Sequence, residues 1–493
     1  MKKIVIVGAG IAGLTAGIYA RESGFEVDIY EAHTIPGGAS TSWRRKGYLF
    51  EGGMHWLTGS SPNNPLNHLW RELGALEEDT PIYCRDPFLT LEYQGQTAHL
   101  YRDTAKLEAH LTQLSPEDKD EIHKLCKDVG RFTKLNMPIG DIKGVQVKYK
   151  APSSKGMAGM LALLPRMGFY NRITAKELAM RYKSPLLQKL FLSVVGEESG
   201  ALATIFTLAT FASGDGGYPL GGSLAMARRM ADRFTSLGGH IHYDAPVEQV
   251  LLQDGIAQGI KIKGEAVTAD AVIVTQDTLK AVDTLFSPPL EEPWIQRMKR
   301  ETRPMLNTFI SLGVEADLSG LPESLLFFTD TPLQCGGQSF NTIGINNYAS
   351  YQGYAPQGCT SITSILMGDS YDYWLNCRQR GVYQEEKERL AKDFIKIIRQ
   401  KWPQTAGKAA VWDVATPLTY ERYCGSFKGS WMSIMGPGAS TKGYPTAPET
   451  IQNLYFAGQR MMVPGGLPVA LQTGRTAVQY LCRDTNTVFQ GDK

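Results

Sequence analysis

Three glycines near the start of the chain, and one acidic residue after them, have the types and spacing that bind a dinucleotide. Gly8, Gly10 and Gly13 lie within six residues, and Glu31 follows 18 residues after Gly13. The first glycine permits a sharp turn, the second lets the backbone approach a pyrophosphate, and the third allows a helix to pack closely on a strand. The carboxylate of Glu31 can accept hydrogen bonds from ribose hydroxyls and disfavours a 2′-phosphate, which argues against NADP.

The residues around this motif supply the strand, helix and strand that it needs. Residues 2–7 form a short apolar run rich in β-branched side chains, which predicts a buried parallel strand. Apolar residues then recur at helical spacing from Ile11 until Gly24 stops the helix, and residues 26–30 predict a second strand. Ala12 lies in the first helical turn, where free N–H groups attract phosphates. The order indicates an α/β fold of the Rossmann type.

A second glycine pair after the acidic residue favours FAD over NAD. Gly37 and Gly38 resemble the extended FAD fingerprint of the amine oxidase and phytoene desaturase superfamily. In that superfamily the paired glycines run beside the phosphates and the ribityl chain of the cofactor. Many members have arginine at the next position, where this chain has Ala39, so one expected phosphate contact is missing. Arg44 and Arg45 are candidates to replace it, or are solvated.

The end of the chain resembles the closing FAD motif of the same superfamily. A predicted strand ends at Gly458, and a helix opens near Leu467. The resemblance implies that Gly458 meets the phosphate and ribityl region and that Gln459 hydrogen-bonds a ribityl hydroxyl. It also places the helix start, with Leu467 and Val469, at the N1–C2=O edge of the flavin, where N–H groups stabilise the negative charge of the reduced ring. By position alone, Val247 is expected near the adenine.

Three segments between these motifs narrow the resemblance. Residues 48–56, 214–223 and 416–422 are similar to segments of the group that contains phytoene desaturases, carotenoid isomerases and retinol saturases, and they occur in the same order. Glu51 stands where that group usually has aspartate. Together with the two terminal motifs, the resemblance covers essentially the whole chain.

The resemblance also gives the candidates for substrate contact and proton transfer. In that group the segment around His55 passes near the flavin ring, so His55 and Trp56 are expected to face the substrate. The alternative is that both pack where two domains meet, since a lone histidine is weak evidence. If a proton must move, the candidates are His55, Tyr420 and Glu51, in that order.

Length and composition predict two interleaved domains. A chain of 493 residues is too long for one core. The formal net charge of +2 does not favour nucleic acid, and seven scattered cysteines with no CxxC pair suggest neither a disulfide framework nor a metal site, which fits a cytoplasmic protein. No uninterrupted apolar run is long enough to span a membrane. The fold class is therefore α/β, with a Rossmann-type FAD-binding domain (residues 1–75, 221–285 and 451–493) interleaved with an α+β substrate domain (residues 76–220 and 286–450).

The inserted region 76–220 is expected to be mostly helical, and part of it is strongly basic. Residues 131–190 contain twelve basic and two acidic residues, a local charge of +10, around the apolar run 157–165. This pattern is typical of a helix that contacts a membrane surface, and it also suits the mouth of an apolar tunnel. A core helix with a solvated basic face would give the same pattern.

These features predict a flavin-dependent enzyme that transfers hydride between flavin N5 and carbon–carbon bonds of an apolar polyene or isoprenoid. No second GxGxxG unit for NAD(P)H is present, so electrons must pass to or from oxygen, a quinone, a diffusible carrier or the substrate itself. The alternatives are a polyene cis–trans isomerase, an amine oxidase and a non-catalytic flavoprotein that binds lipid.

Overall fold

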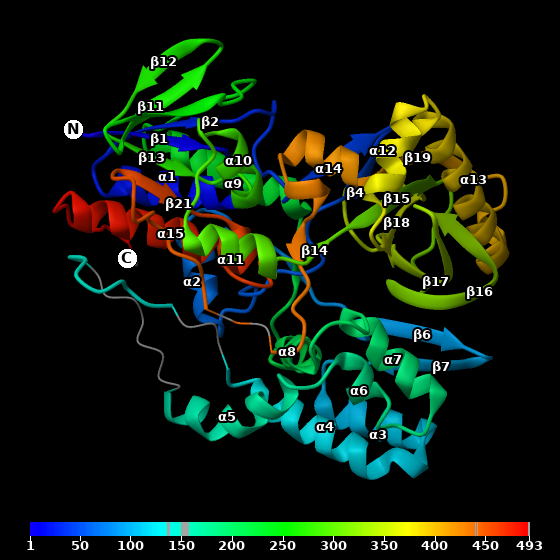
Figure 1. The fold of residues 1–493 in the computed structure, drawn as a ribbon. Coiled ribbons are helices and arrows are strands. Elements are labelled where there is room, and N and C mark those ends of the chain that lie inside the picture. Colours follow the sequence, from blue (N-terminus) through cyan, green and yellow to red (C-terminus); the bar gives the residue numbers. More distant parts are fainter. Residues whose placement is uncertain (136–138, 149–156, 439, 441, 492–493) are drawn as a thin grey trace.

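The computed structural model describes residues 1–135, 139–148, 157–438, 440 and 442–491. Figure 1 shows three parts: a sheet flanked by helices that contains both ends of the chain, a second sheet with its own helices, and a helical part below them. Lys150 and Lys155 of the basic region lie outside the described residues.

The first part is built on a five-stranded parallel sheet in the order β21-β13-β1-β2-β9. Its central strand is the apolar run at the N-terminus, and the four residues Ile4 to Val7 are buried. Strands from distant segments therefore form one sheet, as the predicted α/β fold requires. The bounds are β1 (Lys3–Val7), β2 (Glu26–Tyr30), β9 (His240–His242), β13 (Ala271–Val274) and β21 (Leu454–Phe456).

Different layers cover the two faces of this sheet. Ile4 and Ile6 pack against helices α1 (Ile11–Glu22), α2 (Pro65–Glu72), α9 (Gly222–Ser236) and α15 (Leu467–Asp484). Val5 and Val7 face a three-stranded antiparallel sheet together with helices α10 and α11. The bounds on this face are β10 (Gln249–Gln253), β11 (Ile256–Ile262), β12 (Glu265–Thr268), α10 (Thr278–Thr284) and α11 (Pro293–Glu301).

The second part is a seven-stranded sheet in the order β19-β15-β18-β17-β16-β6-β7. It joins both segments of the expected substrate domain, because β6 pairs in parallel with β16. The helices α12 (Tyr371–Gln379), α13 (Tyr383–Lys401) and α14 (Pro417–Cys424) accompany it. The strands are β6 (Leu89–Tyr93), β7 (Gln96–Leu100), β15 (Asn307–Val314), β16 (Ser324–Cys335), β17 (Gln338–Asn347), β18 (Thr360–Met367) and β19 (Ala409–Ala415).

The third part is helical, as expected for the insertion. Asp128 fastens it together: its carboxylate accepts hydrogen bonds from Arg131 (2.9 Å), Arg166 (2.8 Å) and Tyr170 (2.9 Å). In the described part of the chain, no helix combines the length and the apolar character that a bilayer crossing requires. The helices are α3 (Thr104–Leu114), α4 (Lys119–Phe132), α5 (Met157–Tyr170), α6 (Ala175–Ala179), α7 (Pro185–Val195) and α8 (Ala201–Ala212).

Short paired segments connect the parts. They are the hairpin of β3 (Ser42–Arg45) with β4 (Tyr48–Glu51), the pair of β5 (Ile82–Tyr83) with β8 (Tyr218–Pro219), and the pair of β14 (Pro304–Met305) with β20 (Met432–Ser433). The proposed domain limit at residue 285 falls before α11, whose Trp294 and Met298 pack in the same cluster as Val272. By packing, α11 therefore accompanies the FAD-binding part.

Candidate active site

The glycine turn after β1 has the geometry of a phosphate cradle. Gly8 has φ +101°, which only glycine adopts readily, and a Cβ atom on Gly13 would lie 1.9 Å from the carbonyl oxygen of Gly8. A Cβ atom on Gly10 would find only the carbonyl oxygen of Gly37, at 4.0 Å. The space in front of Gly10 is therefore open, and it adjoins the N-terminus of α1, where Ala12 lines the same cavity.

Glu31 directly follows β2 beside this turn. Its Oε2 accepts a hydrogen bond from the backbone N–H of Ala9 (2.7 Å), and its Oε1 accepts one from His33 (2.8 Å). Burial raises the pKa of the Glu31 carboxyl, while these backbone donors oppose the shift. The carboxyl group lines the cavity, where ribose hydroxyls could reach it.

The second glycine pair closes the cradle. The N–H of Gly37 donates to the carbonyl oxygen of Ala9 (2.8 Å), and Gly38, Ala39 and Val247 also line the cavity. The side chains proposed to replace the missing arginine point elsewhere: Arg44 donates to the carbonyl oxygens of Gly47 (3.1 Å) and Gly353 (3.0 Å).

Arg45 is likewise engaged outside the cavity, in an ion pair with Asp413 at 3.1 Å. Neither arginine is among the described residues that line the cavity. The idea that one of them supplies a phosphate contact is therefore not supported.

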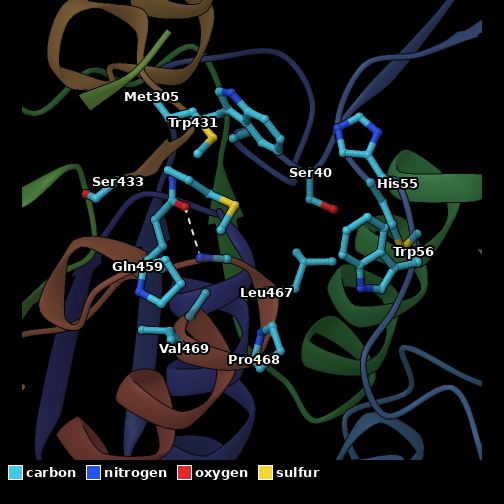
Figure 2. A pocket seen from close by; sticks show the side chains of 18 of the residues that line it. Ser40, His55, Trp56, Met305, Trp431, Ser433, Gln459, Leu467, Pro468 and Val469 are labelled. Atoms are coloured by element: carbon cyan, nitrogen blue, oxygen red, sulfur yellow. Dashed lines mark hydrogen bonds between the residues drawn. The ribbon is translucent and has the colours of Figure 1, made fainter. Parts of the chain in front are cut away.

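The loop before α15 is held from both sides. Gly458 has φ +134°, and its N–H donates to Thr473 Oγ1 (2.9 Å). The side-chain oxygen of Gln459 accepts a hydrogen bond from the N–H of Gly466 (3.2 Å), which Figure 2 shows as a dashed line. Gln459 therefore shapes the helix start, in addition to any contact with a ribityl hydroxyl.

One cavity of about 2140 Å³ connects all these elements and continues beyond them. This volume exceeds the roughly 300–1,000 Å³ of a pocket for one drug-sized ligand. Figure 2 shows part of it, where His55, Trp56, Trp431 and Met305 lie above the start of α15 with Leu467, Pro468 and Val469. The remaining volume can therefore hold a second molecule beside a dinucleotide.

The far end of the cavity is lined mainly by apolar side chains, beside a few charged ones such as Lys189, Glu197 and Glu198. Trp56 contacts Phe211 (ring centroids 5.3 Å apart), and Phe211 stacks on Phe88 (4.2 Å). From there the wall continues along helices α4, α5, α7 and α8 and strand β16. Its apolar side chains include Leu89, Phe132, Leu135, Met167, Leu192, Leu202, Phe206, Leu326, Phe328 and Met435.

His55 stands in the wall where the two ends meet. Its ring meets Trp431 edge-on (centroids 5.1 Å apart). Burial, helped by the positive charge of Arg85, lowers the pKa of His55 to about 4. The imidazole is therefore neutral at physiological pH, where one ring nitrogen can donate a hydrogen bond and the other can accept one.

Both carboxylate oxygens of Glu51 accept hydrogen bonds from groups within the protein. Only 2% of it is exposed. Its Oε1 accepts hydrogen bonds from the N–H groups of Gly53 (2.9 Å) and Met54 (3.1 Å), and its Oε2 accepts from Ser223 N–H (2.9 Å) and the Tyr218 hydroxyl. It is not among the described residues that line the cavity. These contacts favour a carboxylate that positions the loop that carries His55, and its proton-transfer role stays a prediction.

Tyr420 is also placed behind the cavity wall. It is buried against Phe309 and Ala415, and its hydroxyl donates to the carbonyl oxygen of Gly52 at 3.3 Å. It too is missing from the cavity lining given by the described residues. Of the three proton-transfer candidates, the structure brings only His55 to the cavity.

The sequence did not reveal the residues facing His55. Trp431 and Met305 reach the cavity because β14 pairs with β20, and Met305 lies opposite Met432 in that pair. Arg460 supports them from behind, donating to Asp277 (2.8 Å) and Ser433 (2.6 Å). The strand pairing and the contact of Arg460 with Asp277 join residues more than a hundred positions apart, and no local pattern signals them.

A dinucleotide cradle, a helix start at its far side and a large second compartment define a flavoprotein of the oxidoreductase class. The chain belongs to the family of flavin containing amine oxidoreductases, whose model matches residues 11–482. This confirms the predicted cofactor, FAD. The open space before Gly10, the Glu31 carboxyl and the α15 N-terminus fit it.

Individual relatives are distant but nearly full-length. The chain is 24% identical to the chloroplastic prolycopene isomerase of Daucus carota over 482 residues, covering 92% of this chain and 75% of that protein. It is 22% identical to a 4,4'-diapophytoene desaturase of Methylomonas sp over 508 residues (99% and 97% covered). These matches confirm the resemblance to the carotenoid desaturase and isomerase group.

Solved structures show the same fold. Putrescine oxidase bound to putrescine has a TM-score of 0.62 at 17% identity, with 98% of this chain and 99% of that chain covered. An oxidoreductase from Methanosarcina mazei has a TM-score of 0.55 at 18% identity, with 96% and 98% covered. The predicted α/β FAD-binding fold is thereby confirmed.

Proposed function

We propose that this FAD-dependent oxidoreductase acts on carbon–carbon bonds of an elongated apolar substrate, a polyene or isoprenoid. The observation that carries this proposal is the continuous cavity, which runs from the dinucleotide cradle past His55 into a wall of phenylalanine, leucine and methionine side chains. An extended hydrocarbon buries its surface favourably in such a compartment. The desaturase and isomerase names of the relatives support the same substrate class.

In this reaction the chain would stabilise negative charge on the flavin, orient the substrate and exclude water. FAD, when bound, supplies an acceptor and donor of two electrons. The N–H groups at the start of α15, around Leu467 and Val469, would favour negative charge on a flavin ring bound against them. The aromatic side chains of Trp56 and Trp431 orient the substrate and exclude water. We further propose that oxygen, a quinone or a diffusible carrier exchanges the electrons.

Anaerobic photoreduction tests this function. The purified protein should show a flavin spectrum, and a panel of polyenes should be added to the reduced form. Reoxidation by one polyene identifies a reductase-type substrate, whereas bleaching of the oxidised form identifies a desaturase. If neither form responds to any polyene, but an amine bleaches the flavin, the enzyme is an amine oxidase and the proposed substrate class is wrong.

The isomerase relatives make cis–trans isomerisation the second candidate. An isomerase leaves the redox state of its substrate unchanged, so it needs no external acceptor. Turnover of a polyene without oxygen or any added acceptor, with the product equal in mass to the substrate, would decide for isomerisation. Tight polyene binding with no chemistry would instead indicate a lipid-binding flavoprotein.

Replacing His55 by glutamine separates catalysis from cofactor binding. We expect His55→Gln to retain FAD and to lower turnover by about 10- to 1,000-fold, because proton transfer and substrate orientation by one side chain are worth that much. The measurement is single-turnover flavin reduction or reoxidation beside the flavin content of the purified variant. Loss of flavin from the variant would show that His55 has a structural role.

We also propose a membrane contact at α5. Leu164 is 47% exposed and Phe169 38% exposed, while Met167 on the same helix lines the cavity. The neighbouring residues Arg172 and Lys176 are exposed as well. An apolar substrate could therefore pass from a bilayer to the cavity beside this helix.

Vesicle flotation tests the contact. Wild-type protein should float with phosphatidylserine-containing vesicles at low salt, and the double variant Leu164→Glu/Phe169→Glu should bind them about 30-fold or more weakly, since each of the two buried side chains contributes roughly 1 kcal/mol or more. Leu252→Glu, an exposed leucine on β10, is the matched control. Equal flotation of wild type and double variant would reject α5 as the contact.

A further inference from the structure

Arg85 brings a positive charge to the wall of the cavity. It follows β5, and its side chain is 14% exposed. Its Nε donates to the Tyr351 hydroxyl (2.7 Å) and its Nη1 donates to Asn346 Oδ1 (2.8 Å). The guanidinium also lies over the rings of Tyr348 (5.4 Å) and Tyr351 (5.2 Å). It is therefore held in one orientation by groups that carry no negative charge.

The charge of Arg85 is incompletely compensated. The carboxylate at Glu323 is 4.0 Å from Nε, beyond hydrogen-bonding distance, and 32% of that side chain is exposed. Among the described residues, Nη2 of Arg85 has no hydrogen-bond partner. A buried cation without a close anion is costly, so such a group is expected to have a ligand.

Two other arginines of the cavity wall are engaged by structural partners, and a third, Arg422, is exposed to solvent beside the Tyr423 ring. Arg460 is paired with Asp277 at 2.8 Å and hydrogen-bonded to Ser430 and Ser433. Arg102 donates to backbone carbonyl oxygens, among them those of Arg85 (2.9 Å) and Asp215 (2.8 Å). Both have structural partners, whereas Arg85 has donors left.

We propose that Arg85 binds the carboxylate of the substrate, so that the molecule taken by this cavity is a polyene or isoprenoid carboxylic acid. This inference rests on the proposed function and specifies its substrate class. The free N–H groups on Nη1 and Nη2 match the two oxygens of a carboxylate. The rest of the molecule lies against the apolar wall that begins at Trp56 and Phe211.

The anchor also orients the substrate. Arg85 and His55 both line this cavity, so a substrate held at Arg85 lies in the compartment that His55 also borders. A carboxylate on Arg85 fixes one end of the substrate and leaves the hydrocarbon to lie along the apolar side chains of the wall.

A charged and an uncharged probe of the same shape test the proposal on the FAD-loaded protein. The probes are all-trans-retinoic acid and its methyl ester, and binding is read from quenching of tryptophan fluorescence, since Trp56 and Trp431 line the cavity. Wild-type protein should bind the acid about 10- to 100-fold more tightly than the ester, the range expected for a charge-assisted hydrogen bond.

Variants of Arg85 show whether this side chain causes the preference for the acid over the ester. Arg85→Met should lose the preference, because only its affinity for the acid falls. Arg85→Lys should keep part of the preference. Arg300→Met is the control, because that side chain on α11 is 72% exposed. The flavin content and melting temperature of each variant are measured beside the binding.

Three results would overturn the carboxylate site. They are equal affinity of the wild type for acid and ester, an equal loss of both probes in Arg85→Met, and no binding of either probe. The photoreduction assay tests the proposed function separately from the carboxylate site. If the ester or a hydrocarbon polyene reoxidises the flavin as well as the acid does, the enzyme assignment stands and only the carboxylate site falls.

Discussion

Replacement of Gly10 by alanine should give a folded protein that binds FAD about 10- to 100-fold more weakly, the cost of overpacking by one methyl group. Gly10 has φ −69° and ψ 176°, a conformation that alanine adopts without strain. Its Cβ would meet only the carbonyl oxygen of Gly37, at 4.0 Å, so the protein without cofactor has room for it. The added methyl group would occupy the space that the pyrophosphate needs.

The other glycines of the chain provide the controls. Gly13→Ala should instead unfold the FAD-binding part, since its Cβ would lie 1.9 Å from the carbonyl oxygen of Gly8. Gly130→Ala on α4 has no heavy atom within 4 Å of its Cβ and should leave FAD binding unchanged. FAD titration and urea unfolding of the apo-protein measure the two properties. Wild-type FAD affinity in Gly10→Ala would show that the phosphates lie elsewhere.

The parts of the site that the sequence predicted are those encoded by neighbouring residues. The strand, turn and helix around Gly8 and Gly13 follow from β-branched residues, glycine conformations and helical spacing, all within about 30 positions. The helix start at Leu467 is local in the same sense. Such elements depend on residues that are close together in the chain, so a single sequence is enough to recognise them.

The residues whose surroundings the sequence did not reveal depend on contacts between distant segments. Glu51 has the side chain of a general acid, yet its partners Tyr218 and Ser223 lie 167 and 172 residues away and turn it into an anchor. Trp431 reaches the cavity only through the pairing of β14 with β20. The proposed role of Arg85 follows from its contacts with Tyr351 and Asn346, which are distant in the sequence. Side-chain type alone could not distinguish these roles.

Replacement of Glu51 by alanine should lower the free energy of unfolding by about 3–5 kcal/mol, because it leaves several buried donors without an acceptor. The donors are the N–H groups of Gly53, Met54 and Ser223 and the hydroxyl of Tyr218. The carboxylate thus joins the end of β4 to the start of α9. Without it, the loop that carries His55 loses its attachment, and FAD is expected to be lost as well.

Graded variants distinguish an anchor from a catalytic group. Tyr218→Phe removes one donor and should cost about 1 kcal/mol, whereas Glu51→Gln turns N–H groups toward existing donors and should cost about 2–3 kcal/mol. Glu265→Ala on exposed β12 is the surface control. Urea unfolding of each apo-protein gives these values. If Glu51→Ala unfolds like the wild type and keeps its FAD while turnover collapses, the carboxylate acts in the chemistry, and the sequence-based hypothesis about Glu51 is right after all.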